Sequence, residues 1–226
     1  MKKTTAIVIP ARLESSRFPE KMLVKVTDQH CLIQRVEHWC KMVTEHVYVA
    51  TDSKKIAALF PDNAIMTSRD CLNGTERVAE AALQLTDYKN FINVQGDMID
   101  PPIGILDDID SMLSYYDVAT VVTEMDDKSR ADPNTVKCIN NGEEANWFLR
   151  APLDYGDWHL GVYGYRRRAL VQYKEFDKHE PEFIESLEQL RWLTNSKKIG
   201  ITWSEELCGE INTPEDLENW QLTHQN

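Results

Sequence analysis

Residues 5–21 read TAIVIPARLESSRFPEK, an apolar run followed by a segment rich in cations. It starts with the compact apolar run of residues 5–9, which is typical of a buried strand. Pro10 follows, and we expect it to end the strand because its ring fixes φ and its nitrogen has no N–H to extend a ladder. The rest of the stretch is therefore predicted to be a loop that leaves a sheet.

This loop carries three cations, Arg12, Arg17 and Lys21, with Ser15 and Ser16 between the two arginines. Charged and hydroxyl donors at short range suit a polyanion, and a triphosphate above all. The clustering is unusual in a chain with 37 Asp and Glu against 25 Lys and Arg, and the sequence has no GxxxxGK[ST] loop to bind phosphate elsewhere. The loop is therefore the predicted phosphate site, although a solvated basic loop would share this composition.

The composition excludes several classes of protein. A net charge of −12 over 226 residues repels nucleic acids and anionic membranes, so we expect neither as a partner and favour a small anion in a local basic cleft. Five cysteines without a CxxC pair indicate reduced thiols and a cytoplasmic location, not a disulfide framework or a zinc site. No segment is predicted to be a signal peptide or a membrane span.

Strand-like and helix-like segments alternate along the first half of the chain. Strands are predicted at 46–51, 64–67, 91–94 and 118–123, and helices at 31–43, 53–60, 75–85 and 103–113. This alternation predicts an α/β fold with a mostly parallel central sheet flanked by helices, in which ligands bind at the carboxyl ends of the strands. Arg12, Asp52 and Asp97 all follow strands at that edge.

The second half is less regular and predicts a small antiparallel excursion. Its expected elements are strands at 135–139, 158–165 and 199–203, a helix at 182–193 and a last helix that starts at Thr213 with Pro214 in its first turn. The sequence has no internal repeat or linker, so we expect a single domain over residues 1–226.

The segment NVQGD, residues 93–97, places Asp97 at the tip of a buried strand. Magnesium commonly uses one or two carboxylates plus substrate phosphates, so Asp97 is the predicted metal ligand. An N-cap of the following helix is the alternative role. Asp52 is a weaker candidate, because it also leads into the helix expected at Ser53.

Eight segments, in order along the chain, resemble the CMP-Kdo synthetases (3-deoxy-manno-octulosonate cytidylyltransferases), sugar nucleotidyltransferases with a Rossmann-like fold. The segments are IPARLESSRFPEK (9–21), VATD (49–52), TSRDCLNGTERVAEA (67–81), INVQGD (92–97), FLRAP (148–152), HLGVYGYRR (159–167), ESLEQLR (185–191) and NTPEDLE (212–218). Together they span almost the whole chain.

The resemblance implies that CTP and an acidic eight-carbon sugar react, with Mg²⁺ required, to give a CMP-sugar and pyrophosphate. It assigns the triphosphate to Arg12, Ser16, Arg17 and Lys21, cytosine and ribose to Arg69, Asn73, Gly74 and Thr75, the sugar to Gln95, Arg150, His159, Glu188 and Gln189, and the metal to Asp97 with Asn212. Catalysis by Arg12, Arg17, Lys21 and Asp97 would be positioning plus charge neutralisation. The resemblance also implies a homodimer, and the aromatic residues at 147, 155, 158, 163, 165 and 192 could form its interface or part of the core.

The chain departs from the family pattern around the predicted metal and phosphate sites. The departures are Asn212 for an Asp, Glu210 and Glu20 each for a Gly, Met98-Ile99 for Glu-Pro with Asp100 following, and a shortened stretch between Arg150 and His159. Asn212 loses a charge at the metal, and Glu20 adds one near the triphosphate.

These departures leave three interpretations open. Glu210 or Asp100 supplies the missing charge and the enzyme is ordinary. Alternatively, the pocket takes a different acidic sugar, such as an amino-substituted octulosonate or a sialic-acid type of nonulosonic acid. In the third interpretation, the chain is a non-catalytic nucleotide-binding homologue.

Overall fold

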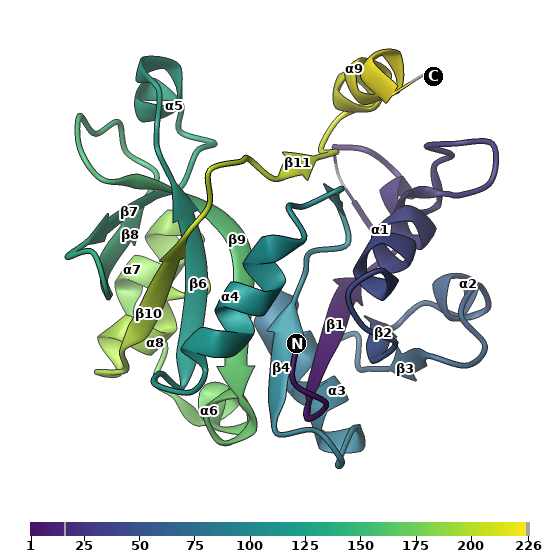
Figure 1. The fold of residues 1–226 in the computed structure, drawn as a ribbon, viewed down its shortest axis with the longest axis horizontal. Helices are drawn as coiled ribbons and strands as arrows, with labels where there is room; N and C mark the ends of the chain where they lie inside the picture. Colours follow the sequence, from purple (N-terminus) through teal and green to yellow (C-terminus); the bar gives the residue numbers. More distant parts are fainter. Residues whose placement is uncertain (16, 225–226) are drawn as a thin grey trace.

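The computed structural model describes residues 1–15 and 17–224 of the chain, and its main feature is a large twisted sheet (Figure 1). In spatial order its strands are β10 (Ile199–Trp203), β6 (Val118–Thr123), β9 (Asp157–Arg166), β4 (Asn90–Asn93), β1 (Thr5–Ala11), β2 (Val47–Thr51) and β3 (Ala64–Met66). Off this path, β7 (Lys137–Asn140) pairs with β8 (Ala145–Leu149) and with β9. A separate short ladder joins β5 (Met98–Ile99) to β11 (Gly209–Glu210).

The strand directions confirm a mostly parallel sheet with an antiparallel part in the second half of the chain. Strands β4, β1, β2 and β3 run parallel, as do β6 and β10. The long strand β9 lies between β4 and β6 and is antiparallel to both. It therefore joins the two parallel groups into one sheet and brings residues from the second half beside the ends of β1 and β4.

Strand β1 continues through Pro10, so the prediction that this proline ends the strand is wrong. Pairing with β2 extends from Ile7 to Ala11, whereas pairing with β4 ends at Val8. At Pro10 the strand has a neighbour on one side only, and an edge position tolerates a residue without an N–H.

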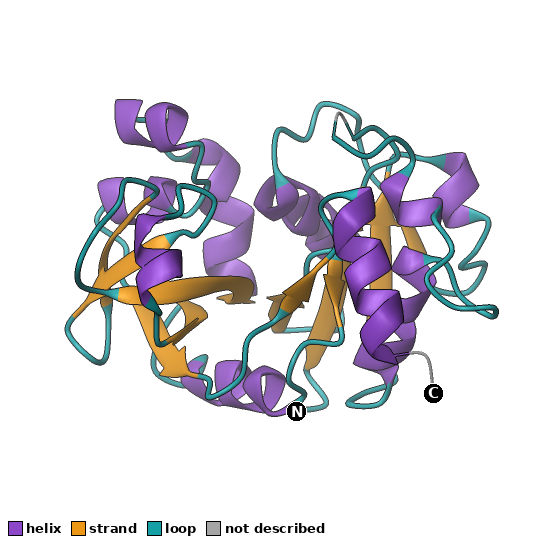
Figure 2. Cartoon of the chain, turned by 90° about the horizontal axis from the view of Figure 1, so that it is seen from above, coloured by secondary structure: helices purple, strands orange, loops and turns teal. Residues whose placement is uncertain are grey.

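Helices cover both faces of the sheet, as the view from above in Figure 2 shows. They are α1 (Leu32–Lys41), α2 (Lys54–Ala57), α3 (Gly74–Gln84), α4 (Gly104–Met112), α5 (Asp127–Ala131), α6 (Arg167–Gln172), α7 (Glu180–Glu185), α8 (Leu190–Thr194) and α9 (Pro214–His224), with 3₁₀ turns η1 (Lys21–Leu23) and η2 (Tyr173–Glu175). Because side chains alternate along a strand, Ile7 and Ile9 of β1 pack with α1 and α4, while Ala6 and Val8 face α3.

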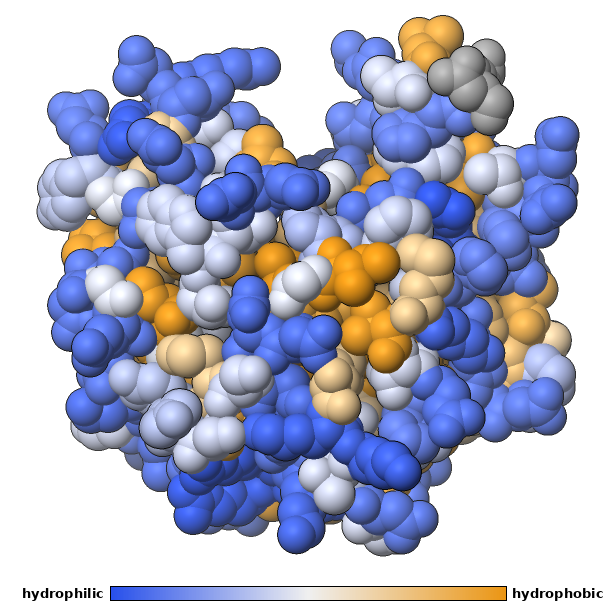
Figure 3. Space-filling model, in the orientation of Figure 1, coloured by the Kyte–Doolittle hydropathy of each residue, from blue (hydrophilic) through white to orange (hydrophobic). Residues whose placement is uncertain are grey.

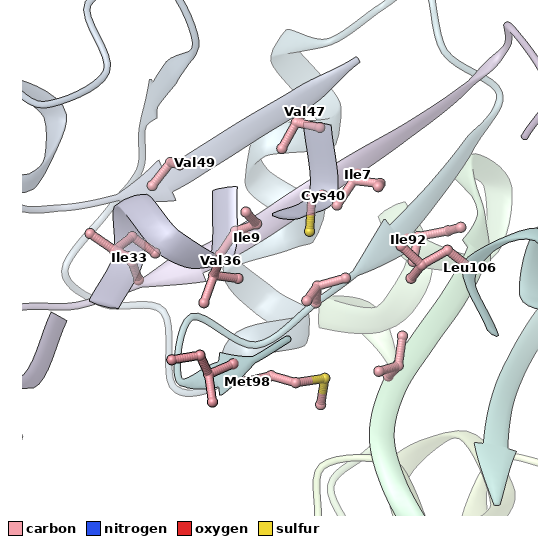
Figure 4. Close-up of a cluster of buried hydrophobic side chains, with 14 of the residues drawn as sticks. Ile7, Ile9, Ile33, Val36, Cys40, Val47, Val49, Ile92, Met98 and Leu106 are labelled. Carbon is pink, nitrogen blue, oxygen red and sulfur yellow. The ribbon is translucent and has the colours of Figure 1, made fainter. Parts of the chain in front are cut away.

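The first of these two cores is drawn in Figure 4. There Ile33, Val36 and Cys40 of α1 lie against side chains of β1 and β2. All three side chains are fully buried. Their spacing of three and four residues is the helical period that predicted this helix. The core fixes α1 and the preceding loop against the sheet, which holds the cation-rich segment at the carboxyl end of β1.

The helix predicted over residues 182–193 is wrong as a single element, because it divides into α7 and α8. Ser186 has φ 53°, a left-handed conformation that ends α7. The connection places Glu188 and Gln189 on the wall of the large cleft. The break in the helix thus serves the site, and no glycine marks it in the sequence.

The buried cysteines and aromatic residues agree with a reduced, densely packed interior. All five cysteines are free, and four of them are buried. Among the aromatic residues considered for an interface, Tyr163, Tyr165 and Trp192 belong to the core, while Tyr155 is exposed. No helix in the described part of the chain has the length and apolar character needed to cross a membrane.

Candidate active site

A cleft of about 1260 Å³ opens at the carboxyl ends of β1 and β4. Its walls come from the loop after β1, the start of α3, the loops around β7 and β9, the α7–α8 connection and the segment around β11. In Figure 3 the upper outline is notched between the part that carries α5 and the part that carries α9, and the side chains around this notch are mainly hydrophilic. A cleft of this size can hold two substrates together.

The predicted phosphate loop forms part of the cleft wall. Arg12 and Arg17 line it and are exposed, and neither guanidinium forms an ion pair within the described part of the chain. Ser16 lies outside the described residues. The carboxylate of Glu20 turns instead to Lys55, 2.8 Å from its ammonium, and Glu20 is absent from the residues that line the cleft. The added charge of Glu20 is therefore paired outside the cleft.

Lys21 is buried and joins the two predicted metal ligands. Its Nζ lies 2.7 Å from Asp97 Oδ2 and 3.2 Å from Asn212 Oδ1. Two oxygen atoms from distant parts of the chain thus converge on one cationic position. Because Mg²⁺ prefers oxygen ligands and takes the remainder from phosphates and water, this donor set fits the ion. The described residues contain no group of three or more His, Cys, Asp and Glu side chains suited to a metal.

The two residues proposed to replace the missing charge at Asn212 have different surroundings. Asp100 forms an ion pair with Arg35, with 2.8 Å between Oδ1 and Nε, and lines a smaller, separate cavity. Glu210 lines the large cleft and accepts a 2.8 Å hydrogen bond from Asn212 Nδ2. Glu210, and not Asp100, is beside the predicted metal ligands.

Asp97 itself does not cap the next helix. The N-cap position of α4 is Ile103, six residues further on, and Asp97 instead pairs with Lys21. The structure thus removes the alternative role that the sequence left open for this carboxylate.

The segment predicted to surround the base and ribose divides between the cleft wall and the interior. Asn73 and Gly74 line the cleft, and the side chain of Asn73 caps α3 by accepting a hydrogen bond from the N–H of Glu76. Thr75 is buried, and its hydroxyl bonds the hydroxyl of Tyr165. Arg69 is exposed and lies outside the cleft lining. Only Asn73 and Gly74 of this group therefore reach the cleft.

All five residues predicted to bind the sugar line the same cleft: Gln95, Arg150, His159, Glu188 and Gln189. Arg150 donates three hydrogen bonds. Its backbone N–H bonds Glu185 Oε2, and its guanidinium bonds the Glu185 carbonyl through Nε and the Asn134 carbonyl through Nη1. The guanidinium is thus fixed in orientation and supplies positive charge to the cleft.

His159 and Glu188 are both tied to the protein. His159 Nε2 lies 3.0 Å from the Thr120 hydroxyl, and burial, with the charge of Arg150, lowers the pKa of His159 to about 3. It is therefore a neutral hydrogen-bonding group. Glu188 accepts the N–H of Thr75 at the start of α3, and burial raises its pKa. Its carboxylate anchors the α7–α8 connection to the base segment.

Three cleft residues went unrecognised in the sequence. Tyr163 follows His159 on the same face of β9 and is 3% exposed, so the period-two alternation of a strand could have identified it. Arg77 is buried and contacts Thr67 and Asp52, which gives Asp52 a structural partner. Arg191 is buried between Glu182 and Glu76 and braces α8 against α3. No local pattern marks the two arginines, because their partners lie outside their own helices, from 9 to 115 residues away along the chain.

Comparison with known proteins agrees with this geometry. A family model described as "Cytidylyltransferase" matches residues 6–199. A 3-deoxy-manno-octulosonate cytidylyltransferase of Acaryochloris marina is 37% identical, with 95% of each chain covered, and one of Leptospira interrogans is 36% identical, with 96% of this chain and 94% of the relative covered. The solved structure of a CMP:2-keto-3-deoxy-manno-octonic acid synthetase complexed with CTP superposes with a TM-score of 0.90 at 31% identity, over 99% of both chains.

Proposed function

We propose that this chain, which belongs to the cytidylyltransferase family and is a nucleotidyltransferase, transfers CMP from CTP to 3-deoxy-manno-octulosonate (Kdo) or a close relative and releases pyrophosphate. The observation that carries the proposal is that one cleft is lined both by cations that suit a triphosphate and by groups that suit an acidic sugar. Arg12, Arg17 and Asp97, which pairs with Lys21, line this cleft, and so do Arg150, His159 and Gln189.

The cations on the loop after β1 suit the triphosphate of CTP. Arg12 and Arg17 are exposed to the cleft, so their guanidinium groups can bind phosphate oxygens with charge-assisted hydrogen bonds. Lys21 is buried beside Asp97, and its ammonium can stabilise the negative charge that develops on the leaving pyrophosphate. These groups neutralise charge and hold the α-phosphorus in place for in-line attack.

Asp97 and Asn212 would hold the magnesium ion, with phosphate oxygens completing its coordination. When bound, the ion supplies Lewis-acid polarisation of the phosphoryl oxygens. The protein's own part is to fix the two oxygens by the Lys21 contact and by the ladder that places β11 beside β5.

The part of the cleft around Arg150 suits an acidic sugar. Arg150 is the natural partner of the sugar carboxylate, because His159 stays neutral and can only donate or accept a hydrogen bond. Tyr163 and Gln189 are each 3% exposed and line the same wall, so they can bond sugar hydroxyls in a site with little water. This arrangement would aim the anomeric oxygen at the α-phosphorus and exclude competing water.

Pyrophosphate release tests the proposal. Purified protein is incubated with CTP, Mg²⁺ and a panel of acids: Kdo, its 8-amino analogue and a sialic acid. We expect release with Kdo or its analogue, and loss of release when Arg150 is changed to Ala but not when the exposed Arg168 is. Binding of CTP with no release from any acid, even at high Mg²⁺, would instead indicate a non-catalytic homologue.

We also propose that the chain forms a homodimer, on the family resemblance. A molar-mass measurement by light scattering at micromolar concentration tests this. A mass of one chain across the concentration range would contradict it.

A further inference from the structure

The amide of Asn212 has only one possible orientation in this structure. On one side it meets Lys21 Nζ, which can only donate, and on the other it meets Glu210 Oε2, which as a carboxylate can only accept. The amide oxygen must therefore face Lys21, and the amide nitrogen must face Glu210. The oxygen is the atom that could bind a cation. The contact with Glu210 therefore keeps Asn212 in the orientation that a ligand needs.

The backbone delivers Glu210 to this position. Strand β11 pairs with β5 so that Glu210 lies opposite Met98, the neighbour of Asp97 in the chain, and the N–H of Ile211 bonds the carbonyl of Asp97 at 3.0 Å. Asp216 accepts the N–H groups of Asn212 and Thr213 and so fixes the next turn. The contact between Glu210 and Asn212 is thus built into the ladder and does not depend on a flexible side chain alone.

The charges around the cation position lead to the same conclusion. Asp97 contributes one negative charge, the amide of Asn212 contributes none, and Lys21 already pairs with Asp97. A divalent cation that shares these oxygens would meet little net negative charge from them. Glu210 adds one carboxylate a single hydrogen bond from the amide of Asn212.

We propose that Glu210 is a positioning residue of the magnesium site, which turns the Asn212 oxygen toward the ion and supplies the negative charge that the amide lacks. This inference rests on the proposed function, because it concerns the ion that the proposed reaction uses. Groups that orient metal ligands are commonly worth about 10- to 100-fold in metal affinity.

Mn²⁺ binding, followed by electron paramagnetic resonance in the presence of saturating CTP, measures the site without turnover. A titration of CTP and Mn²⁺ without protein corrects for the ion bound by free nucleotide. We expect Glu210→Gln to weaken Mn²⁺ binding by about 10-fold or more, since an amide at 210 no longer supplies charge. Glu206→Gln, the same change at an exposed residue of the neighbouring cavity, should leave the affinity within about twofold.

A charge relocation separates positioning from simple damage. In the double variant Glu210→Gln with Asn212→Asp, the carboxylate moves to position 212, and we expect Mn²⁺ affinity to return to within about threefold of the unaltered protein. Unaltered affinity in Glu210→Gln, or failure of the double variant to recover while its thermal melting is unchanged, would overturn the inference alone. Absence of a Mn²⁺ site in the unaltered protein with CTP would overturn both the inference and the magnesium part of the proposed function.

Discussion

Among the single residues, Arg17 gives the clearest test of the proposed phosphate site. Changing it to Ala removes a charge-assisted contact worth about 1.5 to 3 kcal/mol, so CTP affinity should fall by roughly 10- to 100-fold. The KM for the sugar should change much less. Isothermal titration with CTP and steady-state kinetics with Kdo measure the two effects. Lys54→Ala, an exposed cation outside the cleft, is the matched control.

An equal loss in CTP affinity and in sugar KM for Arg17→Ala would contradict the assignment of this residue to the nucleotide. A loss of similar size in Lys54→Ala would show that only the general charge of the surface matters.

Glu20 is held in a conformation that favours glycine. Its φ of 50° is left-handed, which is strained for a residue with a Cβ, and its ion pair with Lys55 is largely exposed and so contributes little. We expect Glu20→Gly to raise the free energy of unfolding by about 0.5 to 1 kcal/mol. Urea denaturation measures this, with Glu205→Gly as the control at a residue without positive φ. A loss of stability in Glu20→Gly as large as that in the control would refute the strain argument.

His159 predicts how stability depends on pH. Its pKa is lowered to about 3 in the folded chain and is near 6.5 when unfolded, so below pH 6.5 the unfolded state binds a proton that the folded state does not. The free energy of unfolding is therefore not reduced by His159 above pH 6.5, and it decreases as the pH falls from 6.5 toward 3. Between pH 6 and 4.5 the unaltered protein should lose about 1.5 to 2 kcal/mol more than His159→Gln does.

Urea denaturation across this pH range measures the difference between the two proteins. The exposed His224 provides the control, since His224→Gln should follow the unaltered protein. Parallel pH curves for the unaltered protein and His159→Gln would show that burial of His159 does not suppress its protonation.

Among the secondary-structure elements, strand β7 carries Lys137, which connects the segments around Arg150. Its ammonium is fully buried and donates to the carbonyls of Asp132, Thr135 and Arg150. Burial lowers the pKa of Lys137. Lys137→Met keeps the length of the side chain but leaves these carbonyls without a donor, so we expect a loss of about 1 to 3 kcal/mol. Urea denaturation tests this, and Lys198→Met, at an exposed lysine, should change stability little.

A Lys137→Met protein as stable as the Lys198→Met protein would mean that water or a rearranged loop satisfies these carbonyls. The kinetic consequence can be read in the same variant. Because Lys137 holds the backbone of Arg150, the KM for the sugar should rise more than the KM for CTP.

The elements also show which parts of the fold could be predicted from the sequence. Helices α1 and α3 and strands β1 and β2 were recognised because their apolar residues repeat with a helical or strand period. The insertion of β9 between β4 and β6, and the β5–β11 ladder, depend on pairing between distant segments and leave no local mark. The division of α7 from α8 at Ser186 was missed because a serine rarely adopts the conformation that ends a helix there.

The same distinction explains the candidate site. Arg12, Arg17, Lys21 and Asp97 could be predicted because each follows a strand at the edge where ligands bind. The contacts of Glu210 with Asn212, and of Arg77 with Asp52, form only once the chain has folded. Motif spacing therefore predicted that these cations and Asp97 lie at one edge of the sheet, whereas the contacts of Asn212 and Asp52 could be seen only in the structure.

In the molecule as a whole, one cleft would hold a nucleotide and an acidic sugar together. Strand β9 makes this possible, since it carries His159 and Tyr163 to the edge of the sheet where β1 and β4 deliver the cations and Asp97. The two substrates would thus meet at a rigid boundary between the parallel and antiparallel parts of the sheet.

A crystal structure of the protein with CTP and Mg²⁺ tests this claim most directly. We predict that the triphosphate lies against Arg12 and Arg17 with an ion at Asp97, and that the α-phosphorus faces the end of the cleft lined by Arg150 and His159. A nucleotide bound elsewhere, or bound in this cleft with its phosphates at the Arg150 end, would contradict the account.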